Sequence, residues 1–269
     1  MKGNERRPDY GNWVSLKWLG VMWFLALIFS GGAVILFCIR FGSPPLFWSI
    51  RILCTLIAIG LLGMAIYFTR VYRLFSYNGP VRLSARILQY VIGHLDWDGQ
   101  GEILDIGCGS GALSVTLAKK YPEAKIVGMD YWGISFDFGK AQCERNARME
   151  GVAERILFEQ GDAANMKYEA ERFDAVISNF VFHEVRSEKN RLLLIGKALN
   201  VLKPGGVFVF HDLFYDARFY GTEDSIRNYL ASLDLEAVHY HKTVEEIGIP
   251  RLLRKKGMLR DIGIIYGRK

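Results

Sequence analysis

A glycine-rich turn behind a short apolar strand is the stretch of this sequence best suited to hold a ligand. The strand is predicted over 103–106 and carries Asp105, and the turn reads Gly107-Cys108-Gly109-Ser110-Gly111. Glycines let the backbone approach a ligand closely and adopt dihedrals barred to other residues. A helical pattern over 112–120 follows, so the N-terminus of that helix would point at the bound group. The stretch therefore predicts a ligand cradle at a strand end.

Polar residues follow the strands predicted after this turn. A strand over 125–129 ends at Asp130, roughly 20 residues beyond the glycines, where an acid can accept hydrogen bonds from both hydroxyls of a ribose. A third strand begins at 156–158 and leads to Asp162, which could accept a hydrogen bond from an adenine amino group. Two further strands are predicted, 173–178 ending at Asn179 and 207–210 following the turn Lys203-Pro204-Gly205-Gly206. The acids together indicate a nucleoside ligand.

The glycine pattern alone leaves the class of nucleoside open. With Ala112 at the last position, the turn also satisfies the dinucleotide fingerprint G-x-G-x-x-G/A. A nicotinamide or flavin enzyme is therefore an alternative, and the ribose acid fits both classes because both ligands contain ribose.

Taken in order and spacing, these motifs make residues 82–269 similar to the class I S-adenosylmethionine-dependent methyltransferases. The motifs are Leu104-Asp105-Ile106-Gly107-Cys108-Gly109-Ser110-Gly111, Gly128-Met129-Asp130, Gly161-Asp162-Ala163, Phe173-Asp174-Ala175-Val176-Ile177-Ser178-Asn179 and Leu202-Lys203-Pro204-Gly205-Gly206. The resemblance implies an α/β, Rossmann-like fold with a seven-stranded, mostly parallel sheet flanked by helices. Its last, antiparallel strand suits residues 262–266.

The resemblance also implies roles for individual residues in binding S-adenosylmethionine. Asp105 and the glycines would hold the methionine part, Asp130 the ribose, and Asp162 with Ala163 the adenine. Tyr131 and Trp132 follow the ribose acid and could form a wall of the adenine site, although core packing explains them equally well. The residues assigned to the cofactor are Asp105, Gly107, Cys108, Gly109, Gly111, Asp130, Tyr131, Asp162, Ala163 and Asn179.

His183 is the residue we single out for catalysis. It lies in the stretch 179–185, beside the place where cofactor and acceptor meet in the resembled family. Methyl transfer requires alignment of the nucleophile and exclusion of water, and a general base is needed only if the acceptor arrives protonated. With an ordinary pKa of about 6.5, His183 would be largely neutral and able to accept that proton. The alternative is a hydrogen-bonded wall residue, and His211-Asp212 is a second candidate pair at the same end of the sheet.

The remaining polar and charged residues indicate no further site. His239 and His241 alternate along a predicted strand and share one face, but the sequence offers no third ligand, so we predict no metal site. Four cysteines without paired spacing predict no disulfide framework. The basic stretch 251–260 could lie on anionic headgroups or form a solvated connection. The net charge of +6 comes with no nucleic-acid motif, so no nucleic-acid partner is expected.

The N-terminal part is far more apolar than the rest of a chain that is 51% hydrophobic and 23% charged. Residues 18–39 carry no charge and 46–68 carry only Arg51 near their start, so each can cross a hydrocarbon core of about 30 Å. A cleaved signal peptide and a buried soluble hairpin are the alternatives. Lysines and arginines gather before the first segment and after the second, which places the N-terminus and the catalytic domain in the cytoplasm.

We therefore expect a multi-pass protein of the cell membrane, with an anchor over 1–72 and a methyltransferase domain over 73–269. A helix over 81–95 is predicted to lead into the domain and pack on the sheet. A membrane anchor suggests a lipid-like or other small amphipathic acceptor, because confinement raises its effective concentration. The alternatives are a non-enzymatic sensor or assembly factor that binds S-adenosylmethionine, and a nicotinamide-dependent oxidoreductase. The oligomeric state is left open.

Overall fold

The computed structural model describes residues 7–39, 45–133 and 139–269, and they form two compact units. The sheet unit comprises residues 7–11 and 84–269, and the hairpin unit comprises residues 12–83. Each is described by itself.

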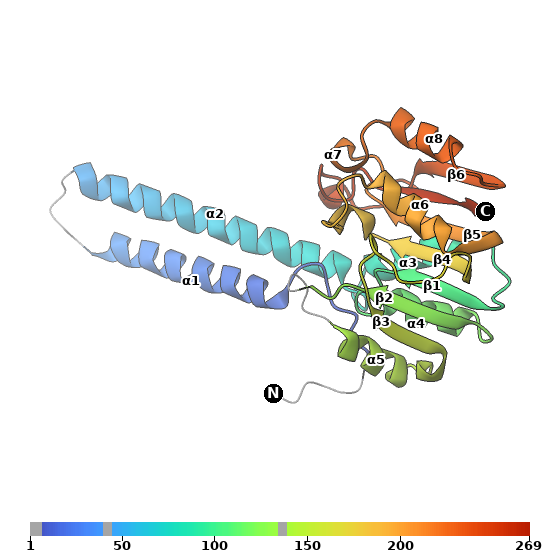
Figure 1. The fold of residues 1–269 in the computed structure, drawn as a ribbon. Helices are drawn as coiled ribbons and strands as arrows, with labels where there is room; N and C mark the ends of the chain where they lie inside the picture. The colour runs from blue at the N-terminus through green and yellow to red at the C-terminus, as the bar shows by residue number, and fades with distance from the viewer. Residues whose placement is uncertain (1–6, 40–44, 134–138) are drawn as a thin grey trace. The chain divides into compact units, whose positions relative to one another are not determined.

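Within its described residues, the sheet unit holds one seven-stranded sheet in the order β3-β2-β1-β4-β5-β7-β6 (Figure 1). Strands β1 to β5 are parallel to one another, and β7 is antiparallel to both β5 and β6. The strands are β1 Glu102–Ile106, β2 Lys125–Asp130, β3 Ile156–Gln160, β4 Phe173–Asn179, β5 Leu202–Asp212, β6 Ala237–Lys242 and β7 Gly263–Arg268. The predicted Rossmann-like sheet with an antiparallel last strand is confirmed, and the carboxyl ends of the parallel strands meet at one edge.

The central strands form because both of their faces are covered. Ile103, Leu104 and Ile106 of β1 are completely buried, as are Val176 and Ile177 of β4. Parallel strands covered on both sides read as continuous apolar runs, which is why the sequence predicts them to within a residue or two. Asp105 lies in the same buried run, and a carboxylate buried there requires a specific partner.

Helices flank the sheet. Helices α4 and α5 pack on β2 and β3, and α6 packs on β5. The helices are α3 Leu83–Gly93, α4 Ala112–Lys120, α5 Lys140–Met149, α6 Leu192–Asn200, α7 Ala217–Tyr220 and α8 Glu223–Ala231, with single 3-10 turns η1 Ala153–Arg155, η2 Phe182–Glu184 and η3 Arg251–Leu253. The predicted helix 112–120 is confirmed, and the predicted 81–95 helix is shorter at both ends. The sequence also predicts a helix over 135–150; α5 covers most of it, and residues 135–138 lie outside the described residues.

The turn expected over 203–206 lies inside β5 instead of before it. Phe173 pairs with Leu202 and Ala175 with Val207, so the register shifts and the extra residues bulge. Gly205 has a φ of 73°, which glycine adopts without steric cost. The bulge is held by the end of the chain, because the Lys269 N–H donates to the Gly206 carbonyl at 2.9 Å. A residue distant in the chain thus stabilises a stretch that reads locally as a turn.

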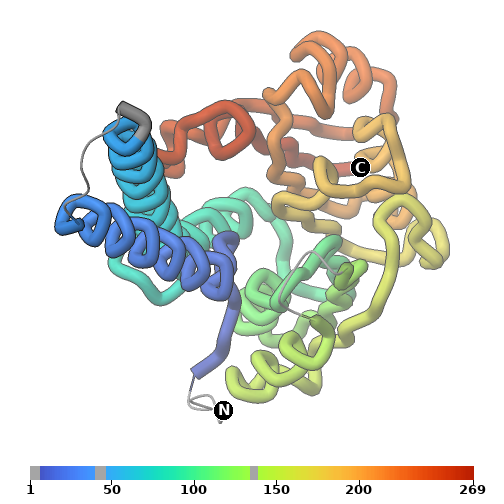
Figure 2. Tube along the Cα trace, turned by 90° about the vertical axis from the view of Figure 1, so that its left-hand side faces the viewer, coloured from blue at the N-terminus to red at the C-terminus, as the bar shows by residue number. Residues whose placement is uncertain are grey.

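In the hairpin unit, α1 (Leu16–Cys38) and α2 (Pro45–Phe75) run antiparallel, side by side (Figure 1; Figure 2 shows the pair from another side). Their contact is built on small side chains at seven-residue spacing, which lets the two backbones approach closely. The Trp23 indole N–H also donates to the Thr69 hydroxyl at 2.9 Å. The buried alanines of this seam are Ala26 and Ala33 on α1 and Ala58 and Ala65 on α2.

The outer surface of the hairpin unit is apolar. Phe24, Leu27 and Ile59 are each more than 60% exposed, and contiguous apolar surface of this size normally meets lipid or another protein. By length and composition both helices could cross a membrane, and only 11% of each most apolar window is buried, unlike the core helix of a soluble protein. Arg51 donates to the Ile39 carbonyl at 2.6 Å and lies over the Trp48 ring, so its charge is partnered within the hairpin.

Candidate functional site

The glycine-rich turn is fastened to the end of β2. Gly107, Gly109 and Gly111 have φ values of 74°, 57° and 81°. The N–H groups of Gly107 and Cys108 both donate to the Met129 carbonyl, at 2.7 and 3.1 Å. A Cβ at Gly107 would overlap the Val181 side chain, so this position has no room for one. The loop between β1 and α4 therefore has the fixed backbone that a ligand cradle requires.

Asp105 carries an unused acceptor directly beneath this loop. Its side chain is fully buried, and its Oδ2 atom accepts a hydrogen bond from the Ser114 hydroxyl at 2.5 Å. Oδ1 has no hydrogen-bond partner among the described residues. Burial, reinforced by the charge of Asp130, raises the pKa of Asp105 to about 7. A cationic donor at Oδ1 would relieve this cost, and the ammonium group of S-adenosylmethionine is such a donor.

Asp130 links the glycine loop to the residues after β2. Its Oδ2 atom accepts from the Gly109 N–H and its Oδ1 atom from the Trp132 N–H, both at 2.8 Å. A carboxylate oxygen can accept a second hydrogen bond, so two ribose hydroxyls could still be held. The Trp132 indole N–H donates to the Gly109 carbonyl at 2.9 Å, whereas the Tyr131 side chain is 68% exposed. Of the two aromatic residues expected as a wall, Trp132 is the one bonded to the loop.

Asp162 lies after β3 and is held as a carboxylate. Its Oδ1 atom accepts from the Ala164 N–H and the Ser187 hydroxyl, both at 2.9 Å. Although desolvation raises the pKa of Asp162, these donors outweigh it and lower the pKa below its usual value. The Gly161 N–H donates to the Asp130 carbonyl at 2.9 Å, so the second and third acids are connected by backbone. Asp105, Asp130 and Asp162 thus follow one another along β1, β2 and β3, and buried Ala163 adjoins the last of them.

His183 and Asp212 form a close pair at the ends of β4 and β5. The His183 Nδ1–H donates to Asp212 Oδ1 at 2.5 Å, and Asp212 Oδ2 accepts from the Val181 N–H at 3.1 Å. The carboxylate of Asp212 is 1% exposed and the His183 side chain 13% exposed. Asp212 therefore fixes both the orientation of the imidazole and the backbone that carries it, and Nε2, which lies 3.5 Å from Glu184 Oε1, is the nitrogen that could reach a substrate.

The pair changes the charge expected for His183. Burial alone would lower the pKa of His183, but the Asp212 carboxylate and its hydrogen bond, together with Glu184, raise it to about 10. The expectation of a largely neutral imidazole is therefore wrong at neutral pH. The sequence shows Asp212 beside His211, whereas the fold turns the Asp212 carboxylate toward His183.

His211, unlike His183, is neutral, because the effect of burial dominates its pKa. It is 1% exposed, and burial lowers its pKa to about 3. Its Nδ1–H donates to Asn179 Oδ1 at 2.9 Å, and its Nε2 atom lies 3.0 Å from the Thr243 hydroxyl, which can donate to it. Asn179 is assigned to the cofactor site by the resemblance, but its side-chain oxygen accepts a hydrogen bond from His211.

The sequence reasoning missed a contact between the N-terminal segment and the glycine loop. Ser110 Oγ donates to the Tyr10 carbonyl at 2.8 Å, and the Asn146 amide of α5 donates to both the Asp9 and the Ser110 carbonyls, at 2.7 and 3.0 Å. Asn146 Oδ1 also accepts from the Asp9 N–H at 2.9 Å. Ser110 lies 100 positions from Tyr10 and Asn146 lies 137 positions from Asp9, and no local pattern marks these pairs. Residues 7–11 are therefore part of the sheet unit.

The comparisons with known proteins agree with this site. A family model described as "Methyltransferase domain" matches residues 98–255. The release factor glutamine methyltransferase of Chlorobaculum tepidum is 30% identical over 43% of this chain and 47% of its own length. The erythromycin 3''-O-methyltransferase of Saccharopolyspora erythraea is 32% identical over 42% of this chain and 34% of its own length. The chain thus spans between a third and a half of the length of these relatives.

A solved structure shares the fold. The geranyl diphosphate C-methyltransferase of Streptomyces coelicolor, solved with Mg²⁺, geranyl diphosphate and S-adenosylhomocysteine, matches with a TM-score of 0.53 and 15% identity. The match covers 74% of this chain and 84% of that one. At this identity the likeness concerns the arrangement of strands and helices.

Proposed function

Because the chain belongs to the methyltransferase-domain family and carries an S-adenosylmethionine-dependent methyltransferase domain, we propose that it methylates a small, lipid-like acceptor at the cytoplasmic face of the cell membrane. The observation that carries the proposal is the buried, half-satisfied carboxylate of Asp105 below the glycine loop, with Asp130 and Asp162 following it. This row accounts for a cationic amino acid, a ribose and an adenine in one ligand, whereas a nicotinamide cofactor supplies no ammonium group for Asp105.

Each group of the site has a part in the transfer. S-adenosylmethionine supplies a methyl group already activated on a sulfonium, so positioning and exclusion of water matter most. Asp105 holds the amino acid part, Asp130 the ribose, and Asp162 with Ala163 the adenine. Tyr131, Cys108 and Asn179 border these positions without a direct role in the chemistry.

His183 acts on the acceptor if the acceptor arrives protonated. In the fraction of molecules in which His183 is neutral, its Nε2 atom takes a proton from a hydroxyl or amine, and Asp212 stabilises the imidazolium that results, as in other His–Asp pairs. The rings of Phe180 and Phe219 lie 6.5 and 5.5 Å from the His183 ring. Aromatic surface around the base favours an apolar acceptor and helps to keep water out.

The hairpin unit supports a membrane-held acceptor. Its two helices are long and apolar enough to span a bilayer, and lysines and arginines flank the pair on the side of both chain ends. An anchored enzyme meets a lipid-soluble partner at a far higher local concentration than a soluble one would. The relatives named above act on a protein and on an antibiotic, so the anchor, and not the family, favours this class of acceptor.

Transfer of labelled methyl groups tests the proposal. Membranes containing the full chain are incubated with methyl-labelled S-adenosylmethionine, and lipid, protein and soluble fractions are separated. We expect label in the lipid fraction that is lost with Asp130→Ala and retained with Asp224→Ala, an exposed acid of α8. Cofactor binding without label in any fraction would contradict an enzyme and favour a sensor, and label confined to protein would contradict the acceptor class.

Cys38 offers a test of the orientation. It is exposed at the end of α1, next to the connection between the two helices, whereas Cys108 and Cys143 are buried. In intact cells an impermeant thiol reagent should label the wild-type chain but not Cys38→Ser. Protection of Cys38 in intact cells, with labelling only after lysis, would overturn the proposed orientation.

A further inference from the structure

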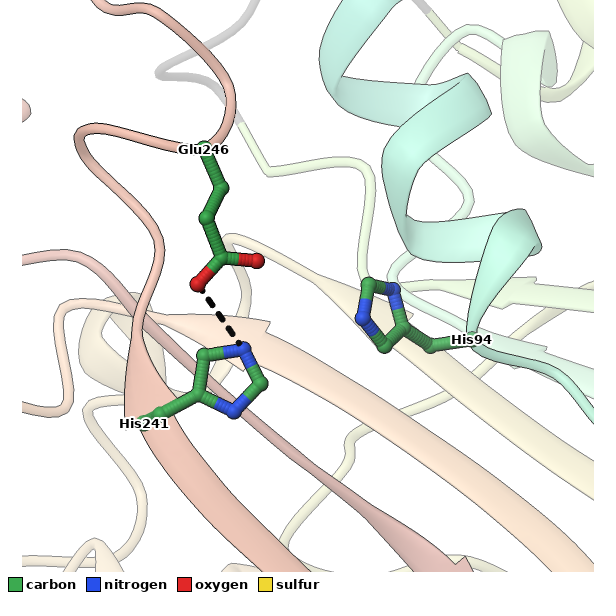
Figure 3. Close-up of side chains that lie close together, drawn as sticks. All are labelled: His94, His241 and Glu246. Atoms are coloured by element: carbon green, nitrogen blue, oxygen red, sulfur yellow. Dashed lines mark ion pairs between the residues drawn. The ribbon is translucent and has the colours of Figure 1, made fainter.

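A second cluster of metal-ligating side chains lies far from the cofactor acids. His94 directly follows α3, His241 lies at the carboxyl end of β6, and Glu246 lies in the turn after β6 (Figure 3). One ligand atom from each residue can be chosen so that all three lie within 4.8 Å of one another. β6 is at the opposite edge of the sheet from β3, so the cluster is separate from the row of cofactor acids. We propose that these three residues bind a divalent transition-metal ion of the zinc type.

The donor set determines the class of ion. Two imidazoles and one carboxylate suit Zn²⁺ and its neighbours in the first transition row, whereas Mg²⁺ and Ca²⁺ prefer oxygen ligands. His241 Nε2 and Glu246 Oε1 are 3.4 Å apart, which is about the edge of a tetrahedron with metal bonds of roughly 2.0–2.2 Å. Figure 3 shows the His94 ring turned toward these two groups, so a small side-chain rotation brings it to the same ion.

Hydrogen bonds around the cluster leave Nε2 of His94 free and fix the orientation of the Glu246 carboxylate. His94 Nδ1–H donates to the Tyr90 carbonyl at 2.9 Å, so Nε2 is the nitrogen that carries the lone pair. The Tyr90 hydroxyl donates to Glu246 Oε2 at 2.6 Å, which leaves Oε1 for the ion, and it lies 3.3 Å from His241 Nε2, a contact that the ion would replace. Outer partners of this kind fix ligand orientation at metal sites and contribute strongly to affinity.

The scaffold holds the three segments together and leaves the cluster accessible. Arg86 of α3 donates to the carbonyl of Ile247, which follows Glu246 in the chain. This hydrogen bond fastens α3 to the turn that carries the third ligand. The side chains of His241 and Glu246 are 35% and 50% exposed, which provides a path for the ion. Three protein ligands leave one position of a tetrahedral ion to water or another small ligand.

His239 distinguishes this proposal from the histidine pair visible in the sequence. It lies on the same face of β6 as His241, but its ring stacks on Tyr266 at 4.8 Å and it is not a member of the cluster. His94, from a helix that ends about 145 positions earlier in the chain, takes its place. His239→Ala is therefore a matched control for His241→Ala.

Co²⁺ and Zn²⁺ binding to the full, untagged chain tests the site. Protein purified in detergent and stripped with a chelator is titrated with Co²⁺, followed by the visible absorption of tetrahedral Co²⁺, and then with Zn²⁺ in competition. We expect one ion per chain, and affinity lowered by His94→Ala and by His241→Ala at least as much as the roughly 10–100-fold that loss of an outer partner costs. Tyr90→Phe should show that smaller loss, and His239→Ala should bind as the wild type.

Two results would overturn the site. One is a wild-type chain that binds no ion at a one-to-one ratio, and the other is a loss with His239→Ala equal to that with His241→Ala. Each variant is also tested for S-adenosylmethionine binding, because retained cofactor binding shows that the sheet unit is folded. The readout does not depend on methyl transfer, so failure of the metal site and failure of the proposed function are distinguishable.

Discussion

Asp212→Asn should move the pKa of His183 from about 10 toward or below its ordinary value of about 6.5. The carboxylate 2.5 Å from His183 Nδ1 stabilises the imidazolium, and without it only the lowering effect of burial remains. The change exceeds three pH units and corresponds to roughly 4–5 kcal/mol in favour of the charged imidazole. NMR of the ring protons of histidine-labelled full chain measures it directly, since the protein has five histidines and His183→Gln identifies the resonance.

The same shift sets the pH dependence of methyl transfer. A general base works only when unprotonated, and about one His183 in a thousand is neutral three pH units below its pKa. We expect kcat/KM of the wild type to rise about tenfold per pH unit from pH 7 to 9, whereas Asp212→Asn should reach its plateau by about pH 7 and His183→Gln should be low and flat. A His183 resonance that titrates near pH 6.5 in the wild type, or a wild-type rate in His183→Gln, would refute the reasoning.

Three further outcomes follow from buried polar groups. Asp105→Asn should weaken S-adenosylmethionine binding about 10–100-fold by calorimetry, because a charge-assisted hydrogen bond contributes roughly 1.5–3 kcal/mol, while the thermal midpoint of the cofactor-free protein should not fall; unchanged affinity would contradict the assignment. Asn146→Ala should lower the free energy of unfolding in urea by about 1–3 kcal/mol, against less than about 0.5 for Arg145→Ala, an exposed residue of the same helix, and equal costs would contradict a fixed N-terminal segment. The raised pKa of His183 stabilises the fold fully below about pH 6.5 and this contribution is lost as pH rises through about 10. The stability cost of Asp212→Asn should therefore be roughly 3 kcal/mol or more at pH 6–7 and should shrink by pH 10 in thermal unfolding, and a cost independent of pH would refute the linkage.

The strands and the glycine loop could be predicted because their signals are local. Residues 103–106 are apolar except for Asp105, which is typical of a strand covered on both faces, and β1 begins one residue earlier. The helix after the loop has the predicted bounds, Ala112–Lys120. The predicted start of the fifth strand, after a turn at 203–206, was wrong. The hydrogen-bond partner that holds this turn within β5 is Lys269, more than 60 positions later in the chain.

The pairings of side chains could not be predicted because they depend on register between distant segments. Asn179 pairs with His211 across β4 and β5, and this register brings Asp212 to His183, which lies in a different turn. The cluster of His94, His241 and Glu246 joins a helix end, a strand end and a turn. Each residue is unremarkable within its own segment, so only the fold reveals the set.

The contrast between His183 and His211 decides which of them can exchange a proton with an acceptor. Both lie near Asp212, but the carboxylate accepts a hydrogen bond from His183, while His211 gives its Nδ1–H to Asn179 and faces the Thr243 hydroxyl with Nε2. The pKa of His183 is raised and that of His211 is lowered to about 3, so His211 stays neutral across the physiological range. Environments that push two neighbouring pKa values apart separate a proton-transferring group from a structural one. His211 therefore orders Asn179 between two strands, and only His183 combines an accessible nitrogen with a carboxylate that stabilises its charged form.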